Sequence, residues 1–437
     1  MELINLKDHS ERLSFSEAVV RGIGRGQGLF FPEKIEPFAA EEIAALLELP
    51  LVPRSRKILR HLLGDELPQL EDIVADAFNF KAPLVPAGED MYAMELFHGP
   101  SLAFKDFGAR FMARVLGAVR GGRHMTILTA TSGDTGAAVA DAFCGQQGID
   151  VVVLYPKGRI AALQAKLIDT LGGNIRAVQI EGIFDECQDL VKTAFDDVDF
   201  SRTVGLNSAN SINISRLLAQ VSYYFEAVAQ LPAECREKVV FSVPCGNFGN
   251  LTAGLIARAL GLKARFIISC NANDTVPRYL ATGKWEPHAT VATLSNAMDI
   301  SRPNNWPRVE ALIKMQGWSQ GEFEYGSMTD AETEEAMREL YQRTSYIAEP
   351  HAAIAASILR AHLRPGESGI FLGTAHPAKF KEAVDRILGT DLPLPAALQK
   401  RLQQPSHSVV LKPDYGTLRE YILKELNPRA GVFCSDR

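Results

Sequence analysis

A single lysine, Lys105, stands where a largely apolar segment (residues 95–104) meets a helix predicted over residues 107–119. Charged side chains are rarely placed among aromatic ones without a partner or a use, because removing an ammonium group from water is costly. Burial favours the neutral amine, which attacks a carbonyl group and forms an imine. The alternative is a lysine whose carbon chain covers apolar surface while its charged end reaches water. The segment alone leaves both interpretations open.

A glycine-rich loop between a predicted strand and a predicted helix contains Gly246, Asn247, Phe248, Gly249 and Asn250. Ligands of open α/β sheets bind at such junctions. Glycines let the backbone close around an anion, and the N–H groups at a helix start attract phosphate. The loop lacks both the Gly-Lys-Ser/Thr ending of a nucleotide P-loop and the G-x-G-x-x-G pattern of a dinucleotide site. We therefore expect a phosphate that is bound but not transferred; the alternative is a tight turn that needs glycine for positive φ.

A second loop of this kind contains Thr131, Ser132, Gly133, Asp134 and Thr135, and it follows another predicted strand. Its hydroxyl and backbone N–H groups converge at a helix start, which suits a carboxylate or a phosphate. The alternative is an N-cap, in which Ser132 or Asp134 closes the helix. Capping alone does not need so many hydroxyl groups, so the pattern favours binding.

A third polar cluster, residues 207–216, precedes a long predicted helix and includes Asn210, Ser211 and Arg216. A guanidinium group is a planar fork that suits phosphate. Arg216, about one and a half turns inside the helix, can therefore turn back towards the same anion as Asn210 and Ser211. The alternative is an ordinary Asn/Ser cap followed by a surface arginine.

The predicted secondary structure that must position these clusters changes near residue 125. From there, short β-rich runs alternate with helical patterns, which is typical of βαβ units around a parallel sheet. The predicted strands cover residues 125–131, 151–155, 175–180, 204–206, 239–243, 266–270 and 370–372. The predicted helices cover residues 134–143, 161–171, 184–195, 211–230, 248–260, 330–343, 351–362, 378–387 and 418–426.

The first 90 residues or so are expected to form a mostly helical N-terminal unit, with short helical patterns at 15–20, 41–47 and 54–63. Residues 22–28 contain a G-x-G spacing, but no strand precedes it and no helix follows directly. This spacing therefore predicts a turn rather than a dinucleotide site.

The composition restricts the class of protein. A chain of 437 residues is long enough for roughly two to three domains of ~150 residues. A net charge of −6 argues against a nucleic-acid-binding surface, and no apolar run approaches the ~20 residues of a membrane span. The six cysteines are scattered without C-x-x-C pairs, so we expect neither a disulfide framework nor a metal site. The early charged residues are unlike a signal peptide, and we expect a cytoplasmic protein.

One imine-forming lysine, one phosphate cradle and two further anion sites at strand–helix junctions form a coherent set. Together they predict a pyridoxal 5'-phosphate enzyme that acts on an amino acid carrying an anionic group of its own. In such enzymes the cofactor is the electron sink, while the protein supplies the imine, the orientation and the acid–base groups.

The segment from His98 to Phe107, the loop from Thr131 to Gly136 and the loop from Gly246 to Asn250 closely resemble threonine synthases of the longer bacterial and fungal type. The resemblance covers nearly the whole chain, including residues 5–8, 207–217, 294–299 and 373–377. The Lys105 segment is specific to that family, whereas the glycine loops are shared with the wider fold-type-II pyridoxal phosphate enzymes.

The fold that this resemblance implies is α/β and tryptophan synthase β-like, with open twisted sheets in two domains. A large αβα domain would comprise residues 91–111 and 211–437, and a small βα domain would comprise residues 112–210. The helical unit of residues 1–90 would pack alongside. The sequence leaves open whether the chain is a monomer or a homodimer.

The resemblance also implies a lyase reaction, the last step of threonine biosynthesis. O-phospho-L-homoserine and water would give L-threonine and inorganic phosphate, by γ-elimination of phosphate and β-addition of water. Lys105 would form the imine with the cofactor and then move protons. Gly246 to Asn250 would wrap the cofactor phosphate. Thr374 would face the pyridine nitrogen and leave it largely unprotonated, and the departing phosphate is a candidate proton carrier.

For the substrate, the resemblance assigns the carboxylate to Thr131, Ser132, Gly133 and Thr135, and the phosphate to Asn210, Ser211 and Arg216, with Thr135 near both. Glu349, His351 and Asn296 are expected to line the site, whereas His98 and His376 are more simply structural.

Asp134 is a departure from the family pattern. Many relatives carry Asn there, and that Asn bonds the ring oxygen of the cofactor. A carboxylate donates a hydrogen bond only when it is protonated, so the role of Asp134 stays open.

Other functions are disfavoured by single features. A serine or threonine dehydratase would need no second anion site, so Arg216 argues against it. A catalytically idle relative that only binds the cofactor should have lost Lys105 or a phosphate loop, and neither is missing. A nucleotide-dependent phosphotransferase would need the Gly-Lys-Ser/Thr ending that the loop at Gly246 lacks.

Overall fold

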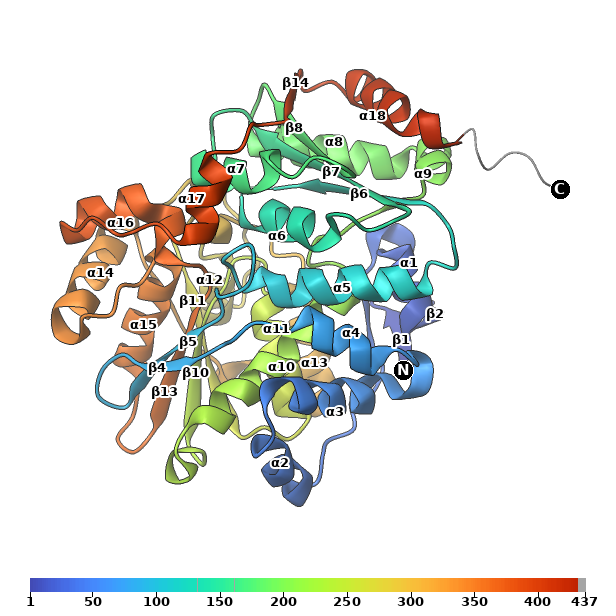
Figure 1. The fold of residues 1–437 in the computed structure, drawn as a ribbon. Helices are drawn as coiled ribbons and strands as arrows, with labels where there is room; N and C mark the ends of the chain where they lie inside the picture. The colour runs from blue at the N-terminus through green and yellow to red at the C-terminus, as the bar shows by residue number, and fades with distance from the viewer. Residues whose placement is uncertain (132, 161, 431–437) are drawn as a thin grey trace.

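The computed structural model describes residues 1–131, 133–160 and 162–430 (Figure 1). Its N-terminal unit combines helices with a three-stranded antiparallel sheet in the order β2-β1-β3. These elements are β1 (Glu2–Asn5), β2 (Asp8–Ser14), β3 (Phe30–Pro32), α1 (Phe15–Arg21), α2 (Ala40–Leu47), α3 (Leu51–Leu63) and α4 (Leu70–Ala77). The sequence predicted α1 to α3 but not the sheet, because its strands are short and β2 is rich in charged, exposed residues.

A six-stranded sheet has the order β12-β11-β10-β13-β5-β4. Its strands are β4 (Leu84–Pro86), β5 (Met91–Glu95), β10 (Val239–Pro244), β11 (Ala264–Cys270), β12 (Glu324–Ser327) and β13 (Ser368–Gly373). All neighbours are parallel except β4, which is antiparallel to β5. β10 and β13 are buried along their whole length, as their continuous apolar pattern predicted. The edge strands β4 and β12 are partly exposed and lack that pattern.

A five-stranded parallel sheet has the order β14-β8-β7-β6-β9. Its strands are β6 (Met125–Ala130), β7 (Ile149–Pro156), β8 (Ile175–Ile180), β9 (Leu206–Asn207) and β14 (Val409–Leu411). The predicted division places residues 211–437 in the large domain, but β14 extends this other sheet. After it, α18 (Tyr415–Ala430) packs against α8 (Phe184–Asp196), as Figure 1 shows at its top in red and green. A strand of three residues is too short for its sequence pattern to predict which strand it pairs with.

The predicted boundary at residue 90 also differs from the sheet pairing, because β4 lies before it and pairs with β5. The other domain limits stay predictions.

The remaining helices are α5 (Lys105–Val119), α6 (Asp134–Phe143), α7 (Ala162–Asp169), α9 (Val198–Val204), α10 (Ile214–Gln230), α11 (Gly249–Ala259), α12 (Thr275–Thr282), α13 (Trp306–Gln316), α14 (Asp330–Thr344), α15 (Pro350–His362), α16 (Lys381–Leu388) and α17 (Ala396–Leu402).

Both faces of the six-stranded sheet are covered. Along β10, Phe241 and Val243 belong to the apolar cluster that includes α10 and α11, whereas Val240 belongs to the cluster that includes α15. This alternation follows from the two-residue period of a strand. It gives the layered α/β arrangement that the alternating pattern predicted.

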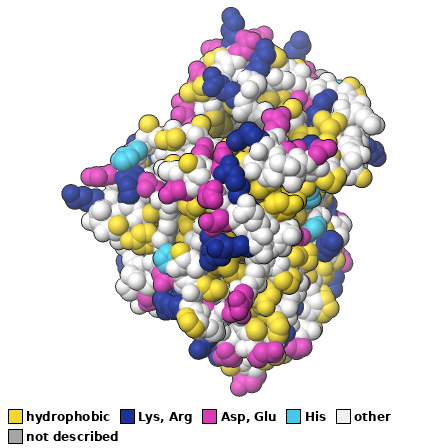
Figure 2. All heavy atoms as spheres, turned by 90° about the vertical axis from the view of Figure 1, so that its left-hand side faces the viewer, with side chains coloured by type: hydrophobic (Ala, Val, Ile, Leu, Met, Phe, Trp, Pro, Cys, Tyr) yellow, Lys and Arg dark blue, Asp and Glu magenta, His cyan; other side chains and the backbone are white. Residues whose placement is uncertain are grey.

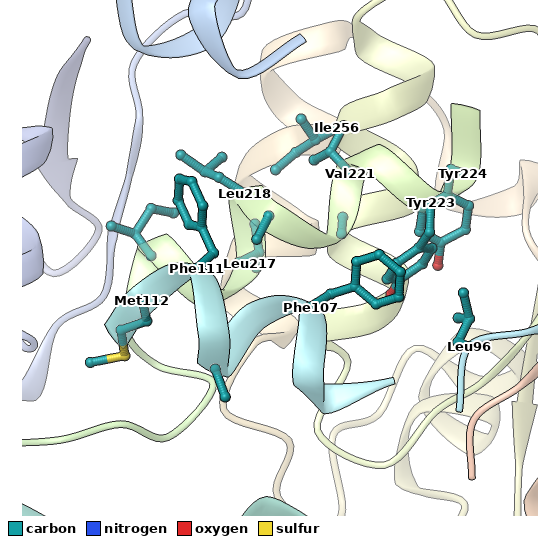
Figure 3. Close-up of a cluster of buried hydrophobic side chains, with 14 of the residues drawn as sticks. Leu96, Phe107, Phe111, Met112, Leu217, Leu218, Val221, Tyr223, Tyr224 and Ile256 are labelled. Carbon is teal, nitrogen blue, oxygen red and sulfur yellow. The ribbon is translucent and has the colours of Figure 1, made fainter. Parts of the chain in front are cut away.

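Three packed helices position candidate residues at their N-terminal ends: Lys105 on α5, Arg216 on α10 and Asn250 on α11. Figure 3 shows side chains of α5, including Phe107, facing the apolar side of α10. The Phe107 and Tyr223 rings meet edge-on, with their centroids 5.4 Å apart. A Cβ at position 108 would lie 2.7 Å from the carbonyl oxygen of Arg216, so only glycine allows α5 and α10 to approach this closely. This packing fixes how the helix starts lie relative to one another.

The surface carries mixed charge. Figure 2 shows acidic and basic side chains interspersed over one face, without a broad basic area. Among the described residues, no helix combines the length and the apolar character needed to cross a membrane.

Candidate active site

The segment before Lys105 is hydrogen-bonded to the end of β13 and to the residue that follows it. The N–H of Leu96 donates to the carbonyl of Gly373 at 3.0 Å, and the N–H of Phe104 donates to the carbonyl of Thr374 at 2.8 Å. Both segments leave the carboxyl ends of neighbouring parallel strands, β5 and β13. The edge where open α/β sheets bind ligands therefore brings Lys105 and Thr374 together.

Lys105 begins α5 and its side chain is half-buried. Its ammonium lies 5.9 Å from the centroid of the Phe104 ring and donates no hydrogen bond to any described residue. Burial lowers the pKa of Lys105 to about 8; Arg216 and Lys379 lower it further, while Asp134 opposes them. A fraction of the amine is thus neutral near pH 7, as imine formation requires.

The glycine-rich loop leaves backbone donors free at the start of α11. The N–H groups of residues 247–250 donate to no acceptor in the described part of the chain. Phe248 has φ of +60°, a left-handed conformation that is costly for a residue with a Cβ. A Cβ on Gly246 would lie 2.6 Å from the Cα of Met298, so the loop also packs tightly against residues 296–298. Free donors at a helix N-terminus suit a phosphate group.

Two polar clusters predicted separately meet at Ser211. The side-chain amide of Asn247 donates to Ser211 Oγ at 2.7 Å, and the amide of Asn305 donates to the same oxygen at 3.2 Å. Behind them, Arg308 donates five hydrogen bonds: two to the carbonyl of Phe30, and one each to those of Ser211 and Ile212 and to the amide oxygen of Asn305. Arg308 therefore holds this cluster against the N-terminal unit.

Asn250 connects α11 with α10. Its side-chain oxygen accepts hydrogen bonds from the hydroxyl groups of Tyr223 and Tyr224 on α10. The amide nitrogen of Asn250 is buried and has no partner among the described residues.

Arg216 lies closer to the start of its helix than predicted, because α10 begins at Ile214 and is capped by Asn213 rather than by Asn210 or Ser211. The guanidinium turns back, and its Nη1 donates to the carbonyl of Ala209 at 2.7 Å. Arg216 is only 2% exposed, and its Nε has no partner in the described chain. Burial lowers the pKa of Arg216 to about 10. Asn210 lies nearby in the same segment, with its side-chain oxygen bound by the Thr129 hydroxyl at 2.7 Å.

The loop after β6 is shaped by Thr131. Its Oγ1 accepts hydrogen bonds from the N–H groups of Gly133 at 2.9 Å and Gly136 at 2.8 Å. The Thr131 hydroxyl thus accepts at the start of α6, where we had considered Ser132 or Asp134 as the cap, while the N–H groups of Asp134 and Thr135 donate to no described residue. Ser132 lies outside the described residues.

Asp134 does not stand alone. Its Oδ1 forms an ion pair with the Lys379 ammonium at 2.6 Å and accepts a hydrogen bond from the Gln164 amide at 3.1 Å. Burial raises the pKa of Asp134, but the ammonium groups of Lys379 and Lys105 outweigh burial and hold it well below its usual range. The carboxylate is therefore ionised at every pH of interest.

Three family models match the chain. They are described as "Threonine synthase N terminus" over residues 4–78, "Pyridoxal-phosphate dependent enzyme" over residues 80–372, and "Threonine synthase, C-terminal" over residues 352–422. The chain belongs to the threonine synthase family. The predicted family and the pyridoxal phosphate cofactor are thereby confirmed.

Relatives in this family match over almost the full length. The threonine synthase of Haemophilus influenzae is 61% identical over 427 residues, which are 97% of this chain and 100% of that one. The threonine synthase of Escherichia coli is 57% identical over 426 residues, with 97% and 99% covered.

Solved structures confirm the predicted fold class. The crystal structure of threonine synthase from Escherichia coli matches with a TM-score of 0.93 at 56% identity, covering 97% of this chain and 100% of that one. A pyridoxal-phosphate-bound threonine synthase from Brucella melitensis matches with a TM-score of 0.89 at 34% identity, covering 97% and 98%.

The residues of this chain fit the cofactor of the threonine synthase family. The Lys105 ammonium donates no hydrogen bond to a described residue, and the N–H groups at the start of α11 have no described acceptor. An aldehyde and a phosphate group would satisfy both.

Thr374 belongs to a hydrogen-bonded group with Glu349 and His351. Its hydroxyl donates to Glu349 at 3.1 Å, and Glu349 also binds the backbone N–H and the ring Nδ1 of His351. Ring Nε2 of His351 accepts a hydrogen bond from the Ala297 N–H at 3.2 Å. The expected contact between Thr374 and the pyridine nitrogen of the cofactor stays a prediction.

The two other histidines considered as site candidates have local partners. His98 pairs with Glu95 at 2.7 Å, and His376 caps the short helix η6 (Pro377–Phe380) by accepting from the Ala378 N–H. Neither observation gives them more than the structural role that we favoured.

Residues outside our predicted set complete the site. Lys379 and Gln164 bind Asp134, while Asn305 and Arg308 hold the segment at Ser211. Lys379 had a sequence signal, because it follows a predicted strand within the segment 373–380, at the edge where ligands bind. The others had none, since their partners are distant in the chain.

Proposed function

We propose that this chain uses pyridoxal 5'-phosphate to convert O-phospho-L-homoserine and water into L-threonine and inorganic phosphate. Membership in the threonine synthase family supports the product. The substrate follows from the site, because the reaction needs an amino acid with a second anionic group.

The observation that carries the proposal is the state of Arg216. Its guanidinium is almost fully buried, forms no ion pair with any described residue and has an unpartnered Nε. An uncompensated buried charge is costly, so an anion must offset it in the working enzyme. A substrate phosphate held by Asn210, Ser211 and Arg216 supplies that anion. A dehydratase substrate such as threonine would leave it unpaired.

The residues fall into two groups by role. For the cofactor, Lys105 would carry the imine, Gly246 to Asn250 would hold the phosphate, and Thr374 would contact the ring. For the substrate carboxylate, the loop from Thr131 to Thr135 would supply the donors, among them the N–H groups of Asp134 and Thr135, which have no acceptor in the described chain. When bound, the cofactor supplies an electron sink for negative charge that develops on the substrate carbons.

Lys105 is the proton carrier that its lowered pKa favours. The bond between Cγ and the phosphate oxygen breaks, and Cγ gains a proton and becomes a methyl group. Cβ loses a proton and gains the hydroxyl of water, whose second proton goes to the departing phosphate. An amine whose pKa is about 8 can both accept and donate protons near neutral pH. Arg216, Asn210 and Ser211 would hold the departing phosphate in place.

The test is phosphate release from O-phospho-L-homoserine by the yellow holoenzyme, with threonine quantified in parallel. We expect one phosphate for each threonine, and no product from unphosphorylated L-homoserine. Release of 2-oxobutyrate from threonine at a higher rate would favour the dehydratase and overturn the proposal.

Borohydride reduction followed by peptide mapping tests the site assignment separately. We expect the pyridoxyl group on Lys105, and an adduct on any other lysine would overturn that assignment.

We also place the enzyme in the cytoplasm. Cys144, Cys187, Cys235, Cys245 and Cys270 carry free thiols in the described chain, which suits a reducing compartment.

A further inference from the structure

Lys379 is a buried cation in a place that the proposed reaction does not explain. It lies on η6 after β13 of the six-stranded sheet, and its side chain has no exposed surface. Its ammonium lies 2.6 Å from Asp134 Oδ1 and donates to the carbonyl of Ser101 at 2.8 Å. A fully buried lysine is rare and needs such partners.

The Lys379–Asp134 pair joins the two sheets. Asp134 opens α6 after β6 of the five-stranded sheet, and its side chain is 4% exposed. Ser101 belongs to the segment that leads into Lys105, on the side of the six-stranded sheet. One ammonium group therefore connects the loop at Asp134 with the segment before Lys105.

The charged groups that face Lys105 come from several elements. They are Asp134 on α6, Arg216 on α10 and Lys379 on η6, and His351 on α15 is close enough to be influenced by Lys105. Asp106, next to Lys105 on α5, faces Lys379. Asp134 is the one of the three groups facing Lys105 that carries negative charge, and Lys379 neutralises it at hydrogen-bond distance.

We propose that Lys379 is a positioning residue: its ammonium pairs with Asp134 so that the two charges cancel beside Lys105 and leave the Lys105 amine reactive near neutral pH. The inference rests on the proposed role of Lys105 as the imine-forming residue, but not on the identity of the substrate.

Removing either charge of the pair should shift the pKa of Lys105, and the two shifts should have opposite signs. Lys379→Met leaves the Asp134 carboxylate unbalanced, so it stabilises the Lys105 ammonium and raises the pKa of that amine. Asp134→Asn leaves the Lys379 ammonium unbalanced and lowers the pKa of Lys105. The double variant removes both charges and restores the original balance.

The experiment measures Lys105 directly in the full chain after removal of the cofactor. Limited acetylation with acetic anhydride at a series of pH values, followed by peptide mass spectrometry, gives the pH at which Lys105 becomes half-reactive. We expect Lys379→Met to raise that midpoint and Asp134→Asn to lower it, each by about one pH unit. The double variant should return to within about 0.3 units of the wild type.

Two further variants separate charge from packing. Lys379→Arg keeps the charge and should keep the midpoint close to that of the wild type. Lys381→Met removes a nearby lysine that pairs instead with Asp385 and Asp391, and it should leave the midpoint unchanged.

The proposal is overturned if both single variants move the midpoint in the same direction, if neither moves it, or if the double variant does not return. A merely structural pair would behave in one of those ways, because each lost partner would loosen the same contact. If Lys379→Met does not fold, Asp134→Asn and the double variant still decide, since their midpoints must differ. Phosphate release from O-phosphohomoserine plays no part in this readout, so failure here is distinct from failure of the proposed function.

Discussion

Asn247 donates its side-chain amide to Ser211 Oγ at 2.7 Å, and this contact joins loops that follow strands of two different sheets. Asn247 belongs to the loop proposed to hold the cofactor phosphate, and Ser211 to the cluster proposed to hold the substrate phosphate. The distance between the two anion sites thus depends on one side-chain contact as well as on the backbone.

Ser211→Ala removes the acceptor of this contact. We expect a roughly five- to thirtyfold loss in kcat/KM for O-phosphohomoserine, because Asn247 and Asn305 lose their shared acceptor and each hydrogen bond contributes about 1 kcal/mol. Steady-state kinetics measure it. Ser222→Ala is the matched control, since the Ser222 hydroxyl is buried without a partner in the described chain and should be dispensable. Equal losses in both variants would contradict the assignment.

Arg216→Met should impair catalysis without lowering stability, whereas Arg308→Met should lower stability. Arg216→Met should lower kcat/KM by about 100-fold, because charge-assisted hydrogen bonds are worth roughly 2–3 kcal/mol. It should leave thermal stability equal or higher, since it removes an uncompensated buried charge. Arg308→Met should instead destabilise the fold by at least about 2 kcal/mol, because the carbonyls of Phe30, Ser211 and Ile212 lose their donor. Thermal unfolding and kinetics on both variants check the contrast; a destabilised Arg216→Met with normal kinetics would reverse our interpretation.

Asp106 should make stability depend on pH. Burial raises the pKa of Asp106 to about 7, although the Ser101 N–H at 3.0 Å opposes this shift. The folded chain therefore keeps this proton to a higher pH than the unfolded chain, whose Asp pKa is about 3.9. Stability from this group is present below pH ~4 and is lost between pH ~4 and 7, by at most about 1.4 kcal/mol per pH unit. We expect Asp106→Asn to flatten this dependence and to be the more stable form at pH 8. Urea unfolding midpoints at pH 5 and pH 8 measure this, and parallel curves for the two proteins would refute it.

Gly246→Ala should weaken cofactor binding through a steric clash. Its Cβ would lie 2.6 Å from Met298 Cα and 3.0 Å from the Ala297 carbonyl oxygen, which are backbone atoms that cannot rotate away. We expect about 1–3 kcal/mol of destabilisation and at least a tenfold rise in the Kd for pyridoxal phosphate, measured by absorbance titration. Gly117→Ala, on exposed α5 surface with its nearest neighbour 3.7 Å away, should be neutral or up to about 1 kcal/mol stabilising. Unchanged cofactor affinity in Gly246→Ala would count against the proposed phosphate loop.

Lys105→Ala should give a folded, colourless and inactive protein. Removing a half-buried ammonium without a described partner costs no native hydrogen bond, so the circular dichroism spectrum should be unchanged. The visible absorbance of the imine and the release of phosphate should both be lost. Turnover that survives this substitution would exclude Lys105 as the reactive amine.

Much of the fold could be predicted because it follows from local patterns. The strands β6, β7, β8, β10, β11 and β13 are continuous apolar runs, and the helices between them show regular periodicity. The sheet at the N-terminus and strands β4, β12 and β14 were not predicted, because short or partly exposed strands depend on the partner that they meet. For the same reason, the sequence did not predict that β4 and β14 pair with strands across the proposed domain limits.

The residues of the candidate site also fall into those that a local sequence pattern predicts and those that depend on the tertiary structure. Lys105, the loop at Gly246, the loop at Thr131 and the cluster at Arg216 could be recognised because each combines a local sequence pattern with a strand–helix junction. The capping role of Asn213 and the hydrogen bond from Thr374 to Glu349 could not, since they depend on exact backbone position.

By itself, the sequence determined which chemical groups this protein has and at which junctions they stand, because residue type and hydrophobic period are local properties. Only the tertiary structure decided which charges face one another. Lys379 and Asp134 lie far apart in the chain and on different sheets, yet burial places them at hydrogen-bond distance beside Lys105. Electrostatic interactions depend on distance and burial, and no pattern along the chain encodes either.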